Sequence, residues 1–67
     1  MAVKSDNQPY EYRLTMTRAD GIEFSPCSGL RFSLEEALDA PKSTARAIQE
    51  DDPSATIVRI VVELRVQ

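Results

Sequence analysis

The sequence predicts one small α+β domain with the element order ββαβ, in which one helix packs on a three-stranded, mainly antiparallel sheet. Apolar residues alternate with polar ones in three segments, as in strands with one buried face. Between the second and third of these segments the apolar residues are spaced three or four apart, as in a helix. With 67 residues, 42% of them hydrophobic and 28% charged, the chain has the composition of a globular protein and room for a single core.

The first two strands are predicted as a hairpin. Residues 10–17 alternate strictly between apolar and polar side chains, and Gly21 then supplies a turn residue that tolerates positive φ. Residues 22–24 alternate again, and we expect Pro26 to end this short arm because proline cannot donate a backbone hydrogen bond. Whether the second strand reaches residues 30–32 is left open by the sequence.

A helix is predicted to begin at Leu34. Ser33 lies three residues before Glu36, the spacing of a capping box. Pro41 lies inside the helical pattern, and we expect it to kink the helix or to break it into two segments. One apolar stripe keeps its phase across the proline, and its members are Leu34, Ala37, Leu38, Pro41, Ala45 and Ile48.

The third strand is predicted over residues 55–66, the longest β-branched run in the chain. A helix between strands 2 and 3 favours a right-handed crossover, so the expected strand order is 2-1-3 with strand 3 as a long edge. By alternation, the helix should cover Tyr12, Leu14, Phe24, Ile60 and Val62, whereas Ile57, Arg59, Val61, Glu63 and Arg65 should lie on the open face.

Residues 1–9 lack any periodic pattern, so we expect them to form a mobile tail and residues 10–67 to form the domain. The start of the sequence has no apolar run typical of a signal peptide, and the expected location is the cytoplasm. A domain of this size is only marginally stable alone. Cys27 is the only cysteine and histidine is absent, so neither a disulfide nor a zinc site is expected to stabilise the domain. Self-association or a protein partner is the remaining way to stabilise it.

The sequence also argues against enzymatic activity and against a bound cofactor. Cys27 is the one side chain with strong nucleophilic character, but no histidine is present to take its proton. The amides of residues 28–34 could bind an anion at the helix start, yet Glu35 and Glu36 in the same turn would repel a phosphate. We therefore expect a chain that is not an enzyme.

The helix region is strongly acidic. Residues 33–52 contain six acidic against two basic residues, a net charge of −4. Negative charge at a helix C-terminus opposes the helix dipole, so part of this pattern has no local structural benefit. We therefore expect a ridge that faces a protein partner, formed by Glu35, Glu36, Asp39, Glu50, Asp51 and Asp52.

The open sheet face is the second candidate surface, formed by Arg13, Ile57, Arg59, Val61 and Arg65. Its arginines could contact nucleic acid, but the chain carries a net charge of −3 and this face should lack aromatic residues on which bases stack. Nucleic-acid binding is therefore the less favoured use. The uncovered third strand instead favours a homodimer through edge pairing.

These features favour a small, acidic, non-enzymatic protein-binding domain. Such domains are frequent among phage and mobile-element accessory proteins that inhibit host defence or nucleic-acid enzymes, as anti-CRISPR proteins do, and this analogy suggests an inhibitor. The alternatives are a structural subunit that assembles through its edge strand and a weak nucleic-acid binder that uses the open sheet face. No motif distinguishes among the three.

Overall fold

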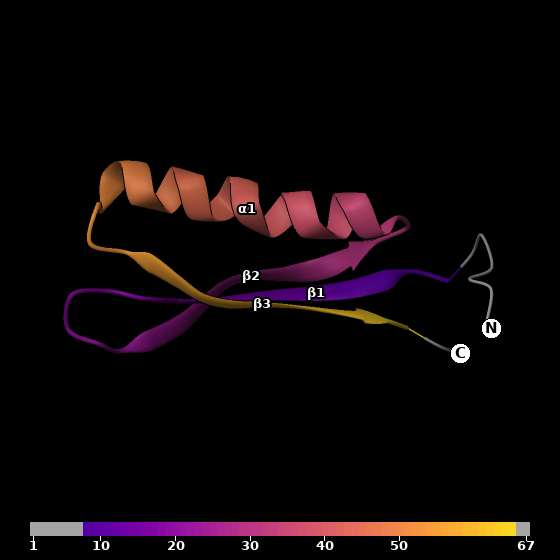
Figure 1. The fold of residues 1–67 in the computed structure, drawn as a ribbon, viewed down its shortest axis with the longest axis horizontal. Helices are drawn as coiled ribbons and strands as arrows, with labels where there is room; N and C mark the ends of the chain where they lie inside the picture. The colour runs from indigo at the N-terminus through magenta and orange to yellow at the C-terminus, as the bar shows by residue number, and fades with distance from the viewer. Residues whose placement is uncertain (1–7, 66–67) are drawn as a thin grey trace.

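The computed structural model describes residues 8–65 and confirms the α+β fold. Strands β1 (Tyr10–Thr17), β2 (Glu23–Arg31) and β3 (Thr56–Leu64) form one sheet in the order β2-β1-β3. Both neighbours of β1 run antiparallel to it. Helix α1 (Leu34–Asp51) crosses one face of this sheet as a second layer (Figure 1). The predicted strand order and helix placement are therefore both correct.

Residues 1–7 of the predicted tail, and Val66 of the predicted third strand, lie outside the described residues. The last two residues of the predicted tail belong to the folded part. Pro9 is buried, and its carbonyl oxygen accepts a hydrogen bond of 2.9 Å from the amide of Arg65. The pairing of β1 with β3 thus continues one step beyond each strand.

Strand β2 is much longer than the short arm predicted from the sequence, and the expectation that Pro26 ends it is wrong. The register moves from Met16 opposite Phe24 to Leu14 opposite Cys27, so β2 holds one extra residue across from β1. Pro26 lies in this bulge, where the ladder is interrupted anyway. Because β2 is an edge strand, the missing N–H of the proline costs no partner strand a hydrogen bond.

A second bulge changes the face on which Ile57 lies. Thr15 pairs with Arg59 but Met16 pairs with Ile57, so Val58 is an extra residue in β3. Directly opposed residues in a sheet share a face, and Met16 lies on the side of the helix. Ile57 therefore lies on the helix side of the sheet, and the prediction that it belongs to the open face is wrong.

Helix α1 is continuous through Pro41, contrary to the predicted kink or break. Pro41 is fully buried, so its packing offsets part of the cost of the backbone hydrogen bond that it removes. The predicted start at Leu34 is confirmed, because the Ser33 hydroxyl accepts a 3.1 Å hydrogen bond from the Glu36 amide. The helix ends where the Asp52 amide donates to the carbonyl oxygen of Ile48.

The core between helix and sheet is thin. Among residues 8–65, the largest fully buried side chains are Leu14, Met16 and Pro41, and the helix contributes mainly alanines. The buried cluster is Leu14, Met16, Ala45 and Ala55, with Phe24, Cys27, Ile48 and Ile60 packed against it. Several large apolar side chains of the described part remain exposed, namely Ile22, Leu30, Phe32, Leu34, Ile57, Val58 and Val61.

Candidate functional site

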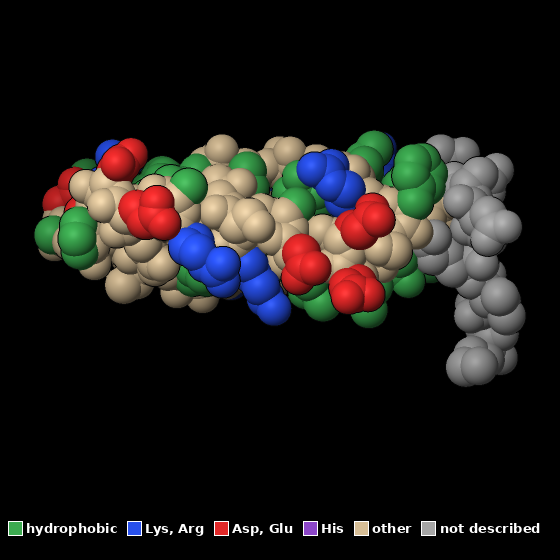
Figure 2. All heavy atoms as spheres, turned by 90° about the horizontal axis from the view of Figure 1, so that it is seen from above, with side chains coloured by type: hydrophobic (Ala, Val, Ile, Leu, Met, Phe, Trp, Pro, Cys, Tyr) green, Lys and Arg blue, Asp and Glu red, His purple; other side chains and the backbone are tan. Residues whose placement is uncertain are grey.

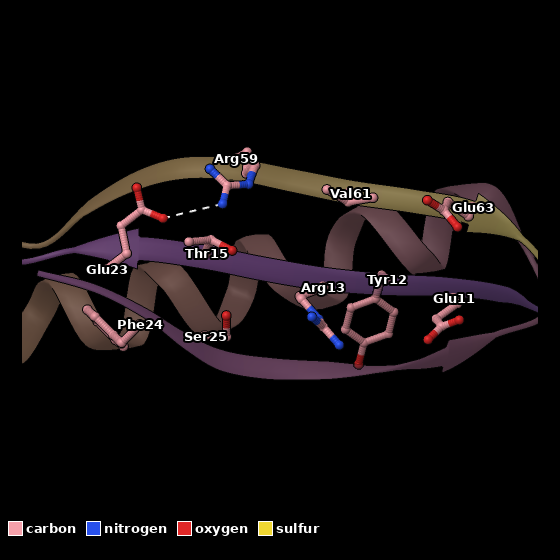
Figure 3. A pocket seen from close by; sticks show the side chains of 10 residues that line it. All are labelled: Glu11, Tyr12, Arg13, Thr15, Glu23, Phe24, Ser25, Arg59, Val61 and Glu63. Atoms are coloured by element: carbon pink, nitrogen blue, oxygen red, sulfur yellow. Dashed lines mark hydrogen bonds and ion pairs between the residues drawn. The ribbon is translucent and has the colours of Figure 1, made fainter.

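The open face of the sheet carries a shallow depression of about 430 Å³. Figure 3 looks onto this face, with the helix behind the three strands. All three strands contribute to it, and its lining is mixed in charge: Glu11, Tyr12, Arg13, Thr15, Glu23, Phe24, Ser25, Arg59, Val61 and Glu63.

Two ion pairs neutralise most of the positive charge on this face. Arg59 Nη2 lies 3.3 Å from Glu23 Oε1, which joins β3 to β2 across β1 (Figure 3). Arg65 Nη1 lies 3.1 Å from Glu11 Oε2. All four side chains are about half exposed, so each pair contributes little to stability. Their effect is on the potential of the surface, which they make nearly neutral.

Arg13, on the central strand, has no ion-pair partner within residues 8–65. It lies opposite Val61 in the register, and Val61 is 40% exposed. Neither tyrosine offers this surface a ring on which bases could stack. Tyr12 is buried, and Tyr10 lies two residues before it on the same strand, so it is on the same face as Tyr12. One unpaired arginine without an exposed aromatic neighbour is a poor site for single-stranded nucleic acid.

The ring of Tyr12 lies over Gly29 of the neighbouring strand β2. An ideal Cβ on Gly29 would lie 2.8 Å from the hydroxyl oxygen of Tyr12, so the ring covers the space that a side chain would need. The guanidinium of Arg31 lies 5.4 Å from the centre of the same ring, which adds a cation–π contact. This arrangement fixes the ring and gives it a structural role in the sheet.

The acidic residues of the helix do not form one continuous ridge. Lys42 and Arg46 lie between an N-terminal acidic group and a C-terminal one, and Figure 2, seen from the helix side, shows basic side chains between acidic ones. The N-terminal group is Glu35, Glu36 and Asp39, and the C-terminal group is Glu50, Asp51 and Asp52.

Asp52 has a local structural role. Its Oδ1 accepts hydrogen bonds from the Ser54 hydroxyl at 2.6 Å and from the Ser54 amide at 3.1 Å, and these lower the pKa of Asp52. Its Oδ2 also lies 3.7 Å from the Arg18 Nε. Asp52 therefore closes the turn that leads to β3, whereas Glu50 and Asp51 stay exposed with no basic residue in the last helical turn.

Cys27 is half-buried and packs against the core cluster from β2, which favours a packing role. Within residues 8–65, no group of three or more cysteine or carboxylate side chains is placed to hold a metal ion. Within residues 8–65, no helix is both long enough and apolar enough to cross a membrane.

The two edges of the sheet differ in how well they are protected from further pairing. Edge β2 is interrupted by its bulge, by Pro26 and by Gly29. Edge β3 has a bulge near its start, at Val58, but contains neither proline nor glycine. Ile57, Val58 and Val61 on it are each about 40% exposed. Within residues 8–65 no other element pairs with its outer side.

The structure thus brings together four of the five predicted sheet-face residues, Arg13, Arg59, Val61 and Arg65, and separates Ile57 from them. It also adds Glu11 and Glu23, which the sequence analysis did not select. Alternation along β1 indicated the face of Glu11, but only the register of β2 shows that Glu23 reaches Arg59.

Comparison with protein-family models, with curated proteins and with solved structures finds no match to this chain.

Proposed function

We propose that this chain is a non-enzymatic protein-binding domain that accepts a partner strand along the free edge of β3. The observation that supports this proposal most strongly is the contrast between the two sheet edges. Natural sheets protect their edges with prolines, bulges and short strands, because unpaired backbone groups recruit other chains. Edge β2 has such protection along its middle, at its bulge with Pro26, whereas the bulge of β3 lies near its start at Val58 and leaves residues 59–64 as an uninterrupted strand without proline or glycine.

Strand addition explains both the backbone and the side chains of this edge. The outward N–H and C=O groups of β3 would supply affinity, and the exposed apolar side chains beside them would be covered by the added strand. Val58 and Val61 are 39% and 40% exposed, a cost that a partner would remove. The thin core of the domain would gain stability from the same event.

The acidic helix is the weaker candidate for the binding surface. Lys42 and Arg46 divide its charge, and Asp52 is held within its own turn. Glu50 and Asp51 remain as an acidic pair with no local partner to explain them. By analogy with small acidic inhibitors, a host defence or nucleic-acid enzyme is the partner class that this acidic pair would engage.

Quantitative affinity purification from the native cell tests the edge against the helix. The tagged wild type is compared with Val61→Lys, which places a charge on the β3 edge, and with the double charge reversal Glu50→Lys/Asp51→Lys on the helix. We expect the edge variant to lose the co-purified protein, including untagged copies of this chain, and the helix variant to retain it. Retention by Val61→Lys together with loss in the helix variant would overturn the proposal. Circular dichroism of each variant checks that it folds.

A further inference from the structure

Resting on the proposed function of the β3 edge, we infer that its occupant is a second copy of this chain, paired antiparallel about a two-fold axis at Val61. The result would be a continuous six-stranded sheet built from two three-stranded sheets.

The sequence of β3 is self-complementary about Val61. In an antiparallel pair centred there, residues equally far before and after Val61 lie opposite each other. Arg59 then faces Glu63 of the second copy, and the symmetry repeats this pair on the other side of the axis. Val61 faces its own copy between the two ion pairs. Opposed strands with opposite charges placed in this way form favourable cross-strand pairs.

The side chains between the charged ones match as well. Ile60 lies opposite Val62 of the second copy, and the regular pairing ends at Arg59 because Val58 is the bulge residue of β3. Both side chains are β-branched and only partly covered in the single chain. The pairing would therefore extend the apolar layer beneath the helix across the new interface.

Neighbouring registers lose this match. Moving the axis by one residue to Ile60 places Arg59 opposite Val61, and moving it to Val62 places Arg59 opposite Arg65. The first register leaves both charges of β3 without an opposite partner, and the second opposes two like charges. Charge complementarity thus selects the register centred at Val61.

The two helices fit on the same side of such a sheet. Arg59, Val61 and Glu63 share the open face, so the pairing keeps both open faces on one side and both helices on the other. Each helix contacts all three strands of its own sheet and so lies above the central strand β1. The two copies of β1 would be three strand spacings apart, roughly 14 Å. Packed helices need only about 8–10 Å between their axes, so the helices do not clash.

Charge reversal tests the dimer interface separately from the folding of the single chain. Arg59→Glu and Glu63→Arg each turn both interface ion pairs into like-charge pairs. We expect each variant alone to dimerise about tenfold more weakly or worse than the wild type in sedimentation equilibrium. An equimolar mixture of the two variants restores opposite charges at both places, so the mixture should associate nearly as well as the wild type. The double variant Arg59→Glu/Glu63→Arg should do the same.

One control separates the interface from the ion pair inside the chain. Arg59 also contacts Glu23, so its reversal disturbs a single-chain contact. Glu23→Gln removes that contact without altering the interface, and it should leave the dissociation constant of the dimer within about twofold of the wild-type value.

Cysteine cross-linking tests the register directly. In a Cys27→Ser background, Val61→Cys places two thiols at the axis, at a Cα separation that permits a disulfide. Glu63→Cys on the same face places them four residues apart along the strands, beyond disulfide reach. Under mild oxidation we expect a covalent dimer for Val61→Cys and little for Glu63→Cys.

The outcomes separate this inference from the proposed function. A monomeric wild type at hundreds of micromolar, or variants that fail to recover when mixed, would overturn the dimer. If Val61→Lys nevertheless abolished capture of a different protein, the edge would still be a binding site and only its assigned occupant would be wrong. A dimer that is indifferent to all β3 variants would overturn both proposals.

Discussion

Replacing Leu14 with alanine should remove a large part of the stability of this domain. Leu14 is fully buried on the central strand, and it contacts the cluster that joins sheet and helix. Its neighbours in that cluster include Ala45 and Ala55, whose short side chains cannot move to fill the space. The cavity left by the substitution should therefore stay open.

The expected loss follows from these contacts. A Leu→Ala change at a fully buried site with little relaxation costs about 3–4 kcal/mol. A domain of this length has a free energy of unfolding on the order of 3–10 kcal/mol. The Leu14→Ala variant should therefore be close to half unfolded at the lower end of this range and clearly less stable at the upper end.

Leu34→Ala provides a matched control. Leu34 is the first residue of the helix and is 48% exposed, so the same chemical change should cost less than about 1 kcal/mol. Urea denaturation followed by circular dichroism measures both losses. All chains are compared at one protein concentration, because a dimer would make the midpoint depend on concentration.

Equal losses for the two leucine variants would refute this reasoning. Such a result would mean either that the helix start is packed more tightly than its exposure indicates, or that the region around Leu14 collapses to fill the cavity. A loss below about 1.5 kcal/mol for Leu14→Ala would favour collapse, and it would mean that the core is more adaptable than its alanine-rich helix face suggests.

Three further predictions concern backbone and turn positions. Pro41→Ala should stabilise the domain by roughly 1 kcal/mol, because the recovered helix propensity of about 3 kcal/mol exceeds the loss of two buried carbons at about 0.8 kcal/mol each. Gly29→Ala should cost about 1 kcal/mol or more, because the added Cβ would lie 2.8 Å from the Tyr12 hydroxyl oxygen. Because the pKa of Asp52 is lowered, its carboxylate should stabilise the fold at pH values above 3.8, the ordinary pKa, and this stabilisation should disappear as the pH falls through the folded pKa. Ser54→Ala should reduce this stabilisation, because it removes the hydroxyl that donates to the carboxylate.

Denaturation midpoints decide each of these predictions. A lower midpoint for the Pro41 variant would show that packing of the ring outweighs the backbone cost. An unchanged midpoint for the Gly29 variant would mean that the tyrosine ring moves aside freely. For Asp52, the stability difference between wild type and Ser54→Ala should shrink as the pH is lowered below 3.8, and a difference independent of pH would contradict the assigned role.

Much of the fold was predictable from local patterns. Alternation located β1 and β3, the Ser33 hydroxyl and Glu36 located the start of the helix, and the handedness of the crossover led to the strand order. Of the candidate site, the free edge of β3 and most of its open-face residues could also be predicted. Each of these features depends on backbone geometry and side-chain period within a short stretch of chain, which the sequence expresses directly.

The remaining features depended on the tertiary structure. Pro26 lies inside β2 because its strand is an edge with a bulge, and Pro41 lies inside the helix because its ring is buried. Ile57 changes face because β3 carries one extra residue, and Arg59 is neutralised because the register brings Glu23 to it. The physical reason is common to all of them. The cost of a missing hydrogen bond, and the direction and partner of a side chain, depend on which distant segment lies alongside, and no local pattern contains that information.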